Sequence, residues 1–150
     1  MPRRPTPAAV LAGTPDEVEA RLYEALQQGD IERLMALWAD DDEIVCVHPG
    51  GPRVIGATAI RASFEAIFAG GGIPVRPEQV HRLQQVGCAL HHLVERVDVA
   101  TEGGPQSACV LATNFYVRTA QGWRLASHHA SPGVAQAVTV AGSDAPSTLH

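Results

Sequence analysis

The side chains that could support chemistry gather in the second half of the sequence, in segments rich in valine, leucine and threonine. His91, Glu95 and His129 supply imidazole and carboxylate groups, while Asn114 and Tyr116 supply hydrogen-bond donors. A carboxylate beside an imidazole holds one tautomer of the ring and raises its basicity, so the pair can act as a general base near neutral pH. An amide or a phenol can donate to a carbonyl or an enolate. These five residues are the first candidates for a site.

They can meet only if their strands present them on one face of a sheet. Four β-rich segments, 79–86, 90–100, 107–118 and 123–131, are separated by turns that contain glycine. If the second and third turns centre on 103–104 and 121–122, strand alternation places all five candidates on the inner face, with His92, Arg124 and His128 on the outer one. A one-residue slip in either hairpin would exchange residues between the faces.

Three further candidates precede these strands. His48 ends a short β-rich run, 43–48, and the turn after it could close the mouth of a pocket. Trp38 and Phe64 stand at helical spacing, which predicts core residues with part of their surface exposed to the pocket. A metal site would have to combine His48 with residues that lack any standard ligand spacing, namely His91, Glu95 and His129. We therefore predict neither a metal nor a cofactor.

These residues admit three roles. Glu95 and His129 could perform catalysis, hold a ligand without chemistry, or satisfy one another in a polar network under the helices. The residue types fit each role, so the sequence leaves the choice open.

Three helices must position the pocket from the N-terminal half. Thr14-Pro15-Asp16-Glu17 combines an N-cap with a proline at the first helical position, and Gly29 ends that helix. Asp30 can cap a second helix, and a third runs from Gly56 to the glycines at 70–72. Three helices and one short strand followed by a meander predict an α+β domain whose helices cover one face of a curved antiparallel sheet.

The composition of the chain argues against several classes of protein. A chain of 150 residues with 45% hydrophobic residues is sized for one core, and its net charge of −5 argues against nucleic acid as a partner. No apolar run approaches the length of a membrane span, and the N-terminus lacks the apolar region of a signal peptide. The three cysteines are far apart and not in ligand spacing. We expect a cytoplasmic protein that binds neither nucleic acid nor membrane.

Several short motifs, taken in order, resemble the superfamily of nuclear transport factor 2, ketosteroid isomerase and the SnoaL-like polyketide cyclases. They are Gly29-Asp30-Ile31-Glu32, Trp38-Ala39-Asp40-Asp41, Gly56, Gly122-Trp123-Arg124 and His129-Ala130-Ser131. The resemblance implies a cone-shaped barrel over residues 14–132, with a flexible arm at 1–13 and a mostly disordered tail at 133–150. The resemblance predicts the fold more specifically than the function.

The resemblance to ketosteroid isomerases is incomplete at the site. His48-Pro49 aligns with the segment that carries the isomerase base. The tyrosine of the first helix falls at Leu22, with Tyr23 one step off the face, and the aspartic acid of the oxyanion hole falls at Ala112. Each such donor is typically worth about 3 kcal/mol, so steroid isomerisation by that mechanism is disfavoured.

Two functions follow as expectations. The first is a cofactor-free isomerase, cyclase, dehydratase or hydrolase for a small hydrophobic substrate, with His129 and Glu95 as base and orienting group and His48 as a further catalytic candidate. The second is a non-catalytic ligand-binding or oligomerisation module resembling the association domain of calcium/calmodulin-dependent protein kinase II. In both, an apolar outer sheet face predicts a homodimer through Val94, Leu111, Thr113, Phe115 and Val117.

Overall fold

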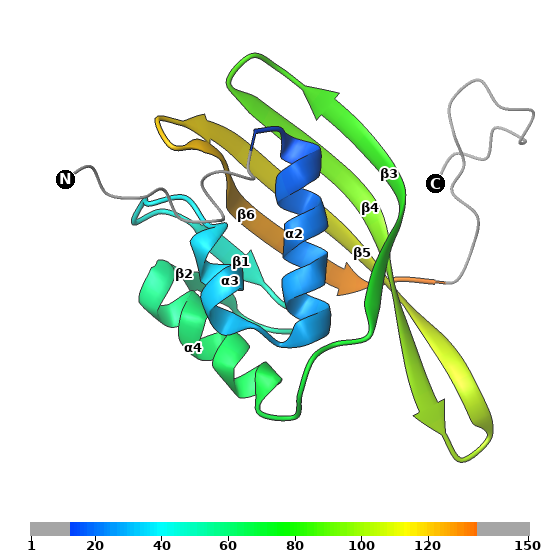
Figure 1. Ribbon diagram of the computed structural model, residues 1–150. Coiled ribbons are helices and arrows are strands. Elements are labelled where there is room, and N and C mark those ends of the chain that lie inside the picture. The colour runs from blue at the N-terminus through cyan, green and yellow to red at the C-terminus, as the bar shows by residue number, and fades with distance from the viewer. Residues whose placement is uncertain (1–12, 135–150) are drawn as a thin grey trace, which may run out of the picture.

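The computed structural model describes residues 13–134, and in that part of the chain three helices lie on one face of a curved sheet (Figure 1). The helices are α2 (Pro15–Gln28), α3 (Ile31–Ala36) and α4 (Ala57–Phe68). The predicted arm at 1–13 and tail at 133–150 fall almost wholly outside the described residues. No helix within residues 13–134 is both long enough and apolar enough to cross a membrane.

Helix boundaries follow the predicted capping signals. The Thr14 hydroxyl accepts a hydrogen bond from the Glu17 amide at 3.1 Å, and this satisfies a donor that the first helical turn leaves free. Gly29 ends α2 at φ 66°, in the left-handed region that glycine enters without steric cost. Asp30 then accepts from the Arg33 amide at 3.1 Å and begins α3. The predicted end of one helix at Gly29 and the predicted start of the next at Asp30 are confirmed.

Six strands form one sheet in the order β2-β1-β6-β5-β4-β3. They are β1 (Val45–Val47), β2 (Arg53–Ile55), β3 (Val75–Gln84), β4 (Cys88–Thr101), β5 (Gly104–Thr119) and β6 (Gly122–Pro132). The antiparallel meander of β3 to β6 is as predicted. The sheet is curved but unclosed, so it is a partial barrel. The predicted antiparallel sheet has one exception, because β1 runs parallel to β6, and β2 had not been predicted.

Strand β3 begins four residues earlier than expected, at Val75 and not at Gln79. Its pairing with β4 shifts between Glu78 and His81, and Gln79 has a positive φ of 52°. An extra residue in one strand bends it and increases its twist. This bulge curls the edge of the sheet towards the helices, as Figure 1 shows for β3 beside α2.

The core lies between the helices and the concave face of the sheet. Its fully buried apolar members come from every layer: Val18, Leu22, Leu34, Ile60, Leu93 and Leu125. Val18 and Leu22 stand four residues apart on one face of α2, and this face packs against the sheet. Removing such side chains from water is the main favourable term for folding.

The register of the sheet decides which polar residues join this core. Across β4 and β5, His91 pairs with Asn114 and Leu93 pairs with Ala112. This register differs by two residues from the one that a turn centred on 103–104 gives, so the predicted faces are kept. Across β5 and β6 the pairing slips between Phe115 and Tyr116, which leaves Ala126 as an extra residue. The slip reverses the alternation for the rest of β6.

His128 and His129 therefore exchange faces relative to the sequence prediction. His128 is opposite Asn114 and is buried, whereas His129 is opposite Thr113 and is exposed. The placement of His129 on the inner face was wrong, because nothing in the turn at 121–122 signals a bulge four residues later.

Candidate functional site

A small cavity opens between helices α2 and α4 and the concave face of the sheet. Its volume is about 150 Å³. Its lining is largely apolar, and three polar side chains reach it: His48, Glu95 and His128. The complete lining is Leu26, His48, Pro49, Phe64, Ile67, Ile73, Val75, Glu95, Val97, Val110 and His128. This cavity is the candidate site.

Glu95 is held in the cavity wall by a tyrosine from helix α2. The Tyr23 hydroxyl donates to Glu95 Oε2 at 2.6 Å, and Asn114 Nδ2 donates to the same hydroxyl at 3.1 Å. A charge-assisted hydrogen bond to a carboxylate is short and strong. We call Tyr23, Glu95, Asn114 and His128 the cavity network.

His128 completes the cavity network in one tautomer. Its Nδ1 lies 2.5 Å from Asn114 Oδ1, and an amide oxygen can only accept, so Nδ1 carries the hydrogen. The lone pair of the neutral ring is therefore on Nε2, 3.9 Å from Glu95 Oε2. Two hydrogen-bond acceptors thus stand side by side in an otherwise apolar wall.

Burial shifts the proton affinities of both groups. Desolvation raises the pKa of Glu95, and the hydrogen bond from Tyr23 opposes this shift without cancelling it. Desolvation lowers the pKa of His128 to about 4, with a smaller contribution from His129. At neutral pH the imidazole is uncharged, and the carboxyl holds its proton more firmly than an exposed glutamate does. This is the electrostatic setting of a general acid–base group.

His48 lies across the cavity at the end of β1. Its Nε2 is 3.0 Å from the Ser63 hydroxyl, which itself donates to the Ile60 carbonyl at 2.7 Å. Because that hydroxyl hydrogen is in use, His48 Nε2 is the donor and the lone pair is on Nδ1. The ring stands edge-on to Phe64, with 4.7 Å between centroids. Burial lowers the pKa of His48, with a contribution from His128.

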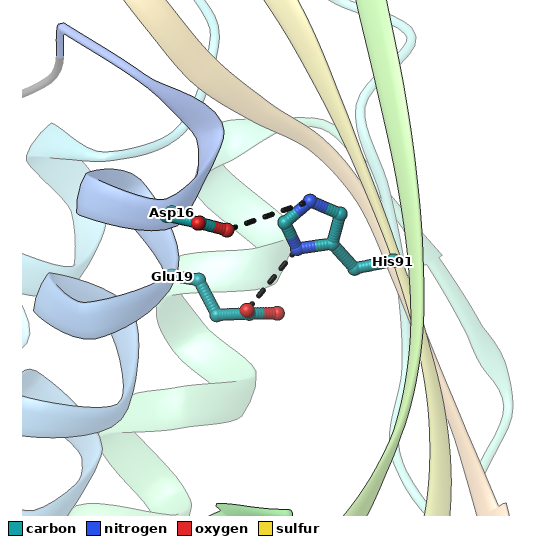
Figure 2. Close-up of side chains that lie close together, drawn as sticks. All are labelled: Asp16, Glu19 and His91. Atoms are coloured by element: carbon teal, nitrogen blue, oxygen red, sulfur yellow. Dashed lines mark hydrogen bonds and ion pairs between the residues drawn. The ribbon is translucent and has the colours of Figure 1, made fainter. Parts of the chain in front are cut away.

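A second polar cluster lies nearer the start of α2. Glu19 Oε2 accepts from His91 Nδ1 at 3.1 Å, and Glu19 Oε1 accepts from the Tyr116 hydroxyl at 3.2 Å. Asp16, one turn earlier on the helix, lies 3.9 Å from His91 Nε2 (Figure 2). We call Asp16, Glu19, His91 and Tyr116 the helix-start network.

The predicted site residues divide among these places. His48, Glu95 and Phe64 line the cavity, whereas Asn114, Tyr116 and His91 are buried behind it and bonded to other side chains. Trp38 lines a different hollow, of about 410 Å³, together with Arg124. His129 lies on the opposite face of the sheet, in a groove of about 550 Å³ that also contains His92.

Sequence reasoning missed two members of the cavity network. His128 was assigned to the outer face because the bulge at Ala126 was not foreseen. Tyr23 was placed one step off the inner face of α2, yet it is buried and bonded to Glu95. The spacing of Glu19 and Tyr23 was an available signal, because residues four apart share one face of a helix. Ala112 is buried, as expected, and supplies no acid.

Comparisons with known proteins agree with this architecture. The family model of the SnoaL-like domain matches residues 16–135. A protein from Streptomyces avermitilis, provisionally described as a dehydratase of the nuclear transport factor 2-like family, is 32% identical, with 79% of this chain and 93% of that one covered at a TM-score of 0.69. Among curated proteins, none matches this chain.

Two similar structures are described as parts of calcium/calmodulin-dependent protein kinase II, one as an association domain and one as a hub. One, from Thiobacillus denitrificans and provisionally so described, is 33% identical, covers 83% of this chain and 98% of its own, and has a TM-score of 0.75. The CaMKII hub of S. rosetta is 20% identical, with 89% and 100% covered at a TM-score of 0.62, and shows the fold alone. The match over residues 16–135 is decisive: the chain belongs to the SnoaL-like domain family, within the nuclear transport factor 2-like superfamily.

Proposed function

We propose that the cavity binds a small, largely apolar molecule and that Glu95 transfers a proton to or from it. The proposal rests on one observation. Glu95 Oε2 and His128 Nε2 are both hydrogen-bond acceptors, and they lie 3.9 Å apart in a largely apolar wall. Few groups are better suited to remove a weakly acidic proton than a carboxylate that burial has made more basic.

The three polar side chains take different roles in this proposal. Glu95 is the acid–base group, since burial raises its pKa while Tyr23 keeps it oriented. His128, whose pKa is about 4, stays neutral and offers Nε2 as an acceptor for a hydroxyl of the substrate. His48 is held by Ser63 on the far side, where its Nδ1 can accept a second hydrogen bond. Tyr23 and Asn114 are positioning residues, because their polar atoms are engaged within the cavity network.

The size of the cavity limits the substrate. A volume of about 150 Å³ is less than that of most drug-sized ligand pockets, which are of the order of 300–1,000 Å³. An engineered cavity of about 150 Å³ in another protein accommodates benzene. The proposed substrate class is therefore a molecule with about six to eight heavy atoms, one ring or a short branched chain, and one or two oxygens.

The reaction class is proton transfer at carbon in an isomerisation, or a dehydration in which Glu95 takes the proton from one carbon and gives it to the hydroxyl that leaves the neighbouring carbon as water. In an isomerisation Glu95 takes a proton from one carbon and returns it to another, so no cofactor is consumed. The similarity to the Streptomyces avermitilis protein, provisionally described as a dehydratase, supports the dehydration branch. Cyclisation and hydrolysis fit less well, because the cavity has little room for a long chain or an added water.

Exchange of carbon-bound hydrogen tests the proposal before the substrate is known. The protein is incubated with cyclohexanone or 2-cyclohexenone in D2O, and loss of the α-proton signal is followed by NMR. We expect exchange above the buffer rate, and a decrease of about 10²–10⁴-fold in Glu95→Gln, since that is the usual contribution of a positioned base. His128→Gln should weaken exchange less, because it removes an orienting acceptor.

His129→Gln is the matched control, since it changes an adjacent histidine on the other face of the sheet. Its exchange rate should equal that of the unchanged protein. Equal rates in Glu95→Gln and the unchanged protein would contradict the proposal. A ketone that raises the melting temperature without any exchange would indicate the alternative, a pocket that binds without chemistry.

We propose a second function, assembly, for the outer face of the sheet. The groove there is lined by Leu90, Leu111 and Phe115 and is large enough, at about 550 Å³, to receive side chains of another subunit. The 33% identity to a protein provisionally described as an association domain supports a second copy of this chain as the occupant. Val94, which was predicted to join this interface, pairs with Leu111 on the same face but is only 3% exposed, so it offers a partner little surface.

Sedimentation velocity at micromolar concentration tests the homodimer. We expect a dimer for the unchanged chain and a monomer for Phe115→Glu, because a charge in an apolar contact is costly to bury. Glu65→Lys, an exposed change on α4 away from the groove, is the matched control and should remain dimeric. A monomeric unchanged chain would overturn the proposal.

A further inference from the structure

The helix-start network contains a histidine nitrogen that lacks a partner. His91 is fully buried, and its Nε2 has no hydrogen-bond partner among residues 13–134. The ring is fixed on its other side by Glu19, and it stands edge-on to Tyr116 with 4.9 Å between centroids. Buried polar atoms are nearly always satisfied, so this one indicates a missing ligand.

The tautomer of His91 follows from Glu19. A carboxylate accepts hydrogen bonds and does not donate them, so the hydrogen is on Nδ1 and the lone pair of the neutral ring is on Nε2. Figure 2 shows that Nε2 points at Asp16, whose Oδ1 lies 3.9 Å away. Two acceptors then face each other, and Arg82, which donates to the same Asp16 oxygen, makes no hydrogen bond to His91 Nε2. A cation between the two acceptors would satisfy both.

We propose that Asp16 and His91 bind a divalent transition-metal ion of the zinc class, with Glu19 as the residue that positions His91. Ligand atoms of the three residues all lie within 4.8 Å of one another. A carboxylate that accepts from the second nitrogen of a metal-binding histidine is a common arrangement, because it fixes the tautomer and increases the basicity of the ring.

The distance between the two ligand atoms is close to what an ion requires. Zinc binds histidine nitrogen and carboxylate oxygen at about 2.0–2.2 Å, so two tetrahedral ligand atoms lie about 3.4 Å apart. Asp16 would have to approach His91 by about 0.5 Å from the observed 3.9 Å. Its side chain is 60% exposed, so a small rotation can supply that movement.

Arg82 competes with the metal for Asp16. Its Nε donates to Asp16 Oδ1 at 2.8 Å, and both side chains are largely exposed. The same oxygen cannot serve a guanidinium and a metal ion equally well, so loading the site must weaken this ion pair. Removing the guanidinium should therefore increase metal affinity.

Calorimetric titration with Zn²⁺ tests the site in the untagged full chain after treatment with a chelator. His81 and His92 are opposite each other on the exposed side of β3 and β4, where such a pair could itself bind zinc, so the titrations use the His92→Gln background. In that background we expect one ion per chain. Asp16→Asn and His91→Gln should each abolish detectable binding.

Two further variants separate a metal site from incidental binding. Glu19→Gln should weaken binding by about 10–100-fold with unchanged stoichiometry, as expected for a group behind the ligand. Arg82→Gln should strengthen binding. Asp16→Asn is the decisive variant, because its exposed side chain is not needed for folding, which circular dichroism verifies.

Absence of zinc binding in the His92→Gln chain would overturn the proposal, and so would binding that survives Asp16→Asn. A third result, no zinc binding together with a doubly protonated His91 seen by nitrogen-15 NMR, would also overturn it. In that case the cation between His91 and Asp16 is a proton.

Discussion

The cavity network and the helix-start network share three kinds of side chain. Each joins a glutamate, a tyrosine and a histidine across α2 and the sheet: Glu95, Tyr23 and His128 in the first, Glu19, Tyr116 and His91 in the second. The arrangement is reciprocal, because the helix supplies the tyrosine in the first and the glutamate in the second. The two differ in where the remaining histidine nitrogen points.

That difference separates an accessible carboxylate from an enclosed one. In the cavity network His128 Nε2 and Glu95 lie at the wall of a cavity, so a guest molecule can reach them. In the helix-start network Glu19 is bonded on both oxygens and only His91 Nε2 remains, directed at Asp16. A carboxylate whose partners are complete holds the fold together, whereas one with an open side can act on a substrate.

Replacement of the two glutamates should give the largest difference. Glu19→Ala leaves two buried donors, on His91 and Tyr116, without an acceptor, and breaking such a buried pair destabilises by about 3–5 kcal/mol. Glu95→Ala leaves only the Tyr23 hydroxyl, which water in the enlarged cavity can reach, so the loss should be about 1–3 kcal/mol. Urea unfolding at pH 7 measures both free energies.

Glu19→Gln and Glu95→Gln are the matched controls, because each keeps one acceptor oxygen in place. Both should be milder than the corresponding alanine variants. A loss for Glu95→Ala as large as that for Glu19→Ala would mean that the cavity network is as closed as the helix-start network. The proposed site would then lose its accessible carboxylate.

The pH dependence of stability should identify His128 as a buried neutral ring. Its folded pKa of about 4 lies below the ordinary value of 6.5, so the unfolded chain binds a proton first as the pH falls. The contribution of neutral His128 to the free energy of unfolding is fully present above pH 6.5. It is lost as the pH falls from there through 4. Between pH 7 and pH 5 the unchanged protein should lose about 2 kcal/mol more than His128→Gln.

Glu95 changes the free energy of unfolding with pH in the opposite sense to His128 over part of this pH range. Its folded pKa is raised, so its contribution is complete below the ordinary value for a glutamate and is lost as the pH rises through the folded pKa. Comparison with His128→Gln removes this background, because Glu95 is present in both proteins. Identical pH profiles for the two would show that His128 is not buried as a neutral ring.

The two tyrosines should differ by a smaller amount. Tyr23→Phe removes a donor from Glu95 and an acceptor from Asn114, whereas Tyr116→Phe removes a donor from Glu19. At about 1 kcal/mol for each hydrogen bond, the expected losses are about 2 and about 1 kcal/mol. Thermal unfolding resolves this difference, and equal losses would indicate that the bond between Asn114 and Tyr23 contributes nothing.

Local sequence signals were sufficient for most of the fold. Thr14, Gly29 and Asp30 specified the helix boundaries through caps whose chemistry is local, and the alternation along β4 and β5 placed Glu95 and Asn114 correctly. The parallel pairing of β1 with β6 was not accessible in this way, because it joins segments that are about 80 residues apart.

The site was harder to predict, since it depends on single-residue shifts. One extra residue at Ala126 was enough to put His128 in the cavity wall and His129 outside. Tyr23 was missed because the inner face of α2 is wider than its apolar stripe and includes polar residues bonded to the sheet. Both errors arise from tertiary contacts that no local pattern records.

His129→Ala should have the smallest effect on the isolated chain, and it tests the bulge directly. His129 is exposed and its nearest neighbours are the walls of the outer groove, so its loss should change the free energy of unfolding by less than about 0.5 kcal/mol. His128→Ala, one residue earlier, removes a buried ring and leaves Asn114 Oδ1 without its donor, a loss of about 2–3 kcal/mol. The measurement must be made below the dissociation constant of any dimer, because His129 would be buried in an interface formed at the groove. A reversed order for these adjacent histidines would show that β6 continues without the bulge at Ala126, and His129 would then be the histidine that faces Glu95.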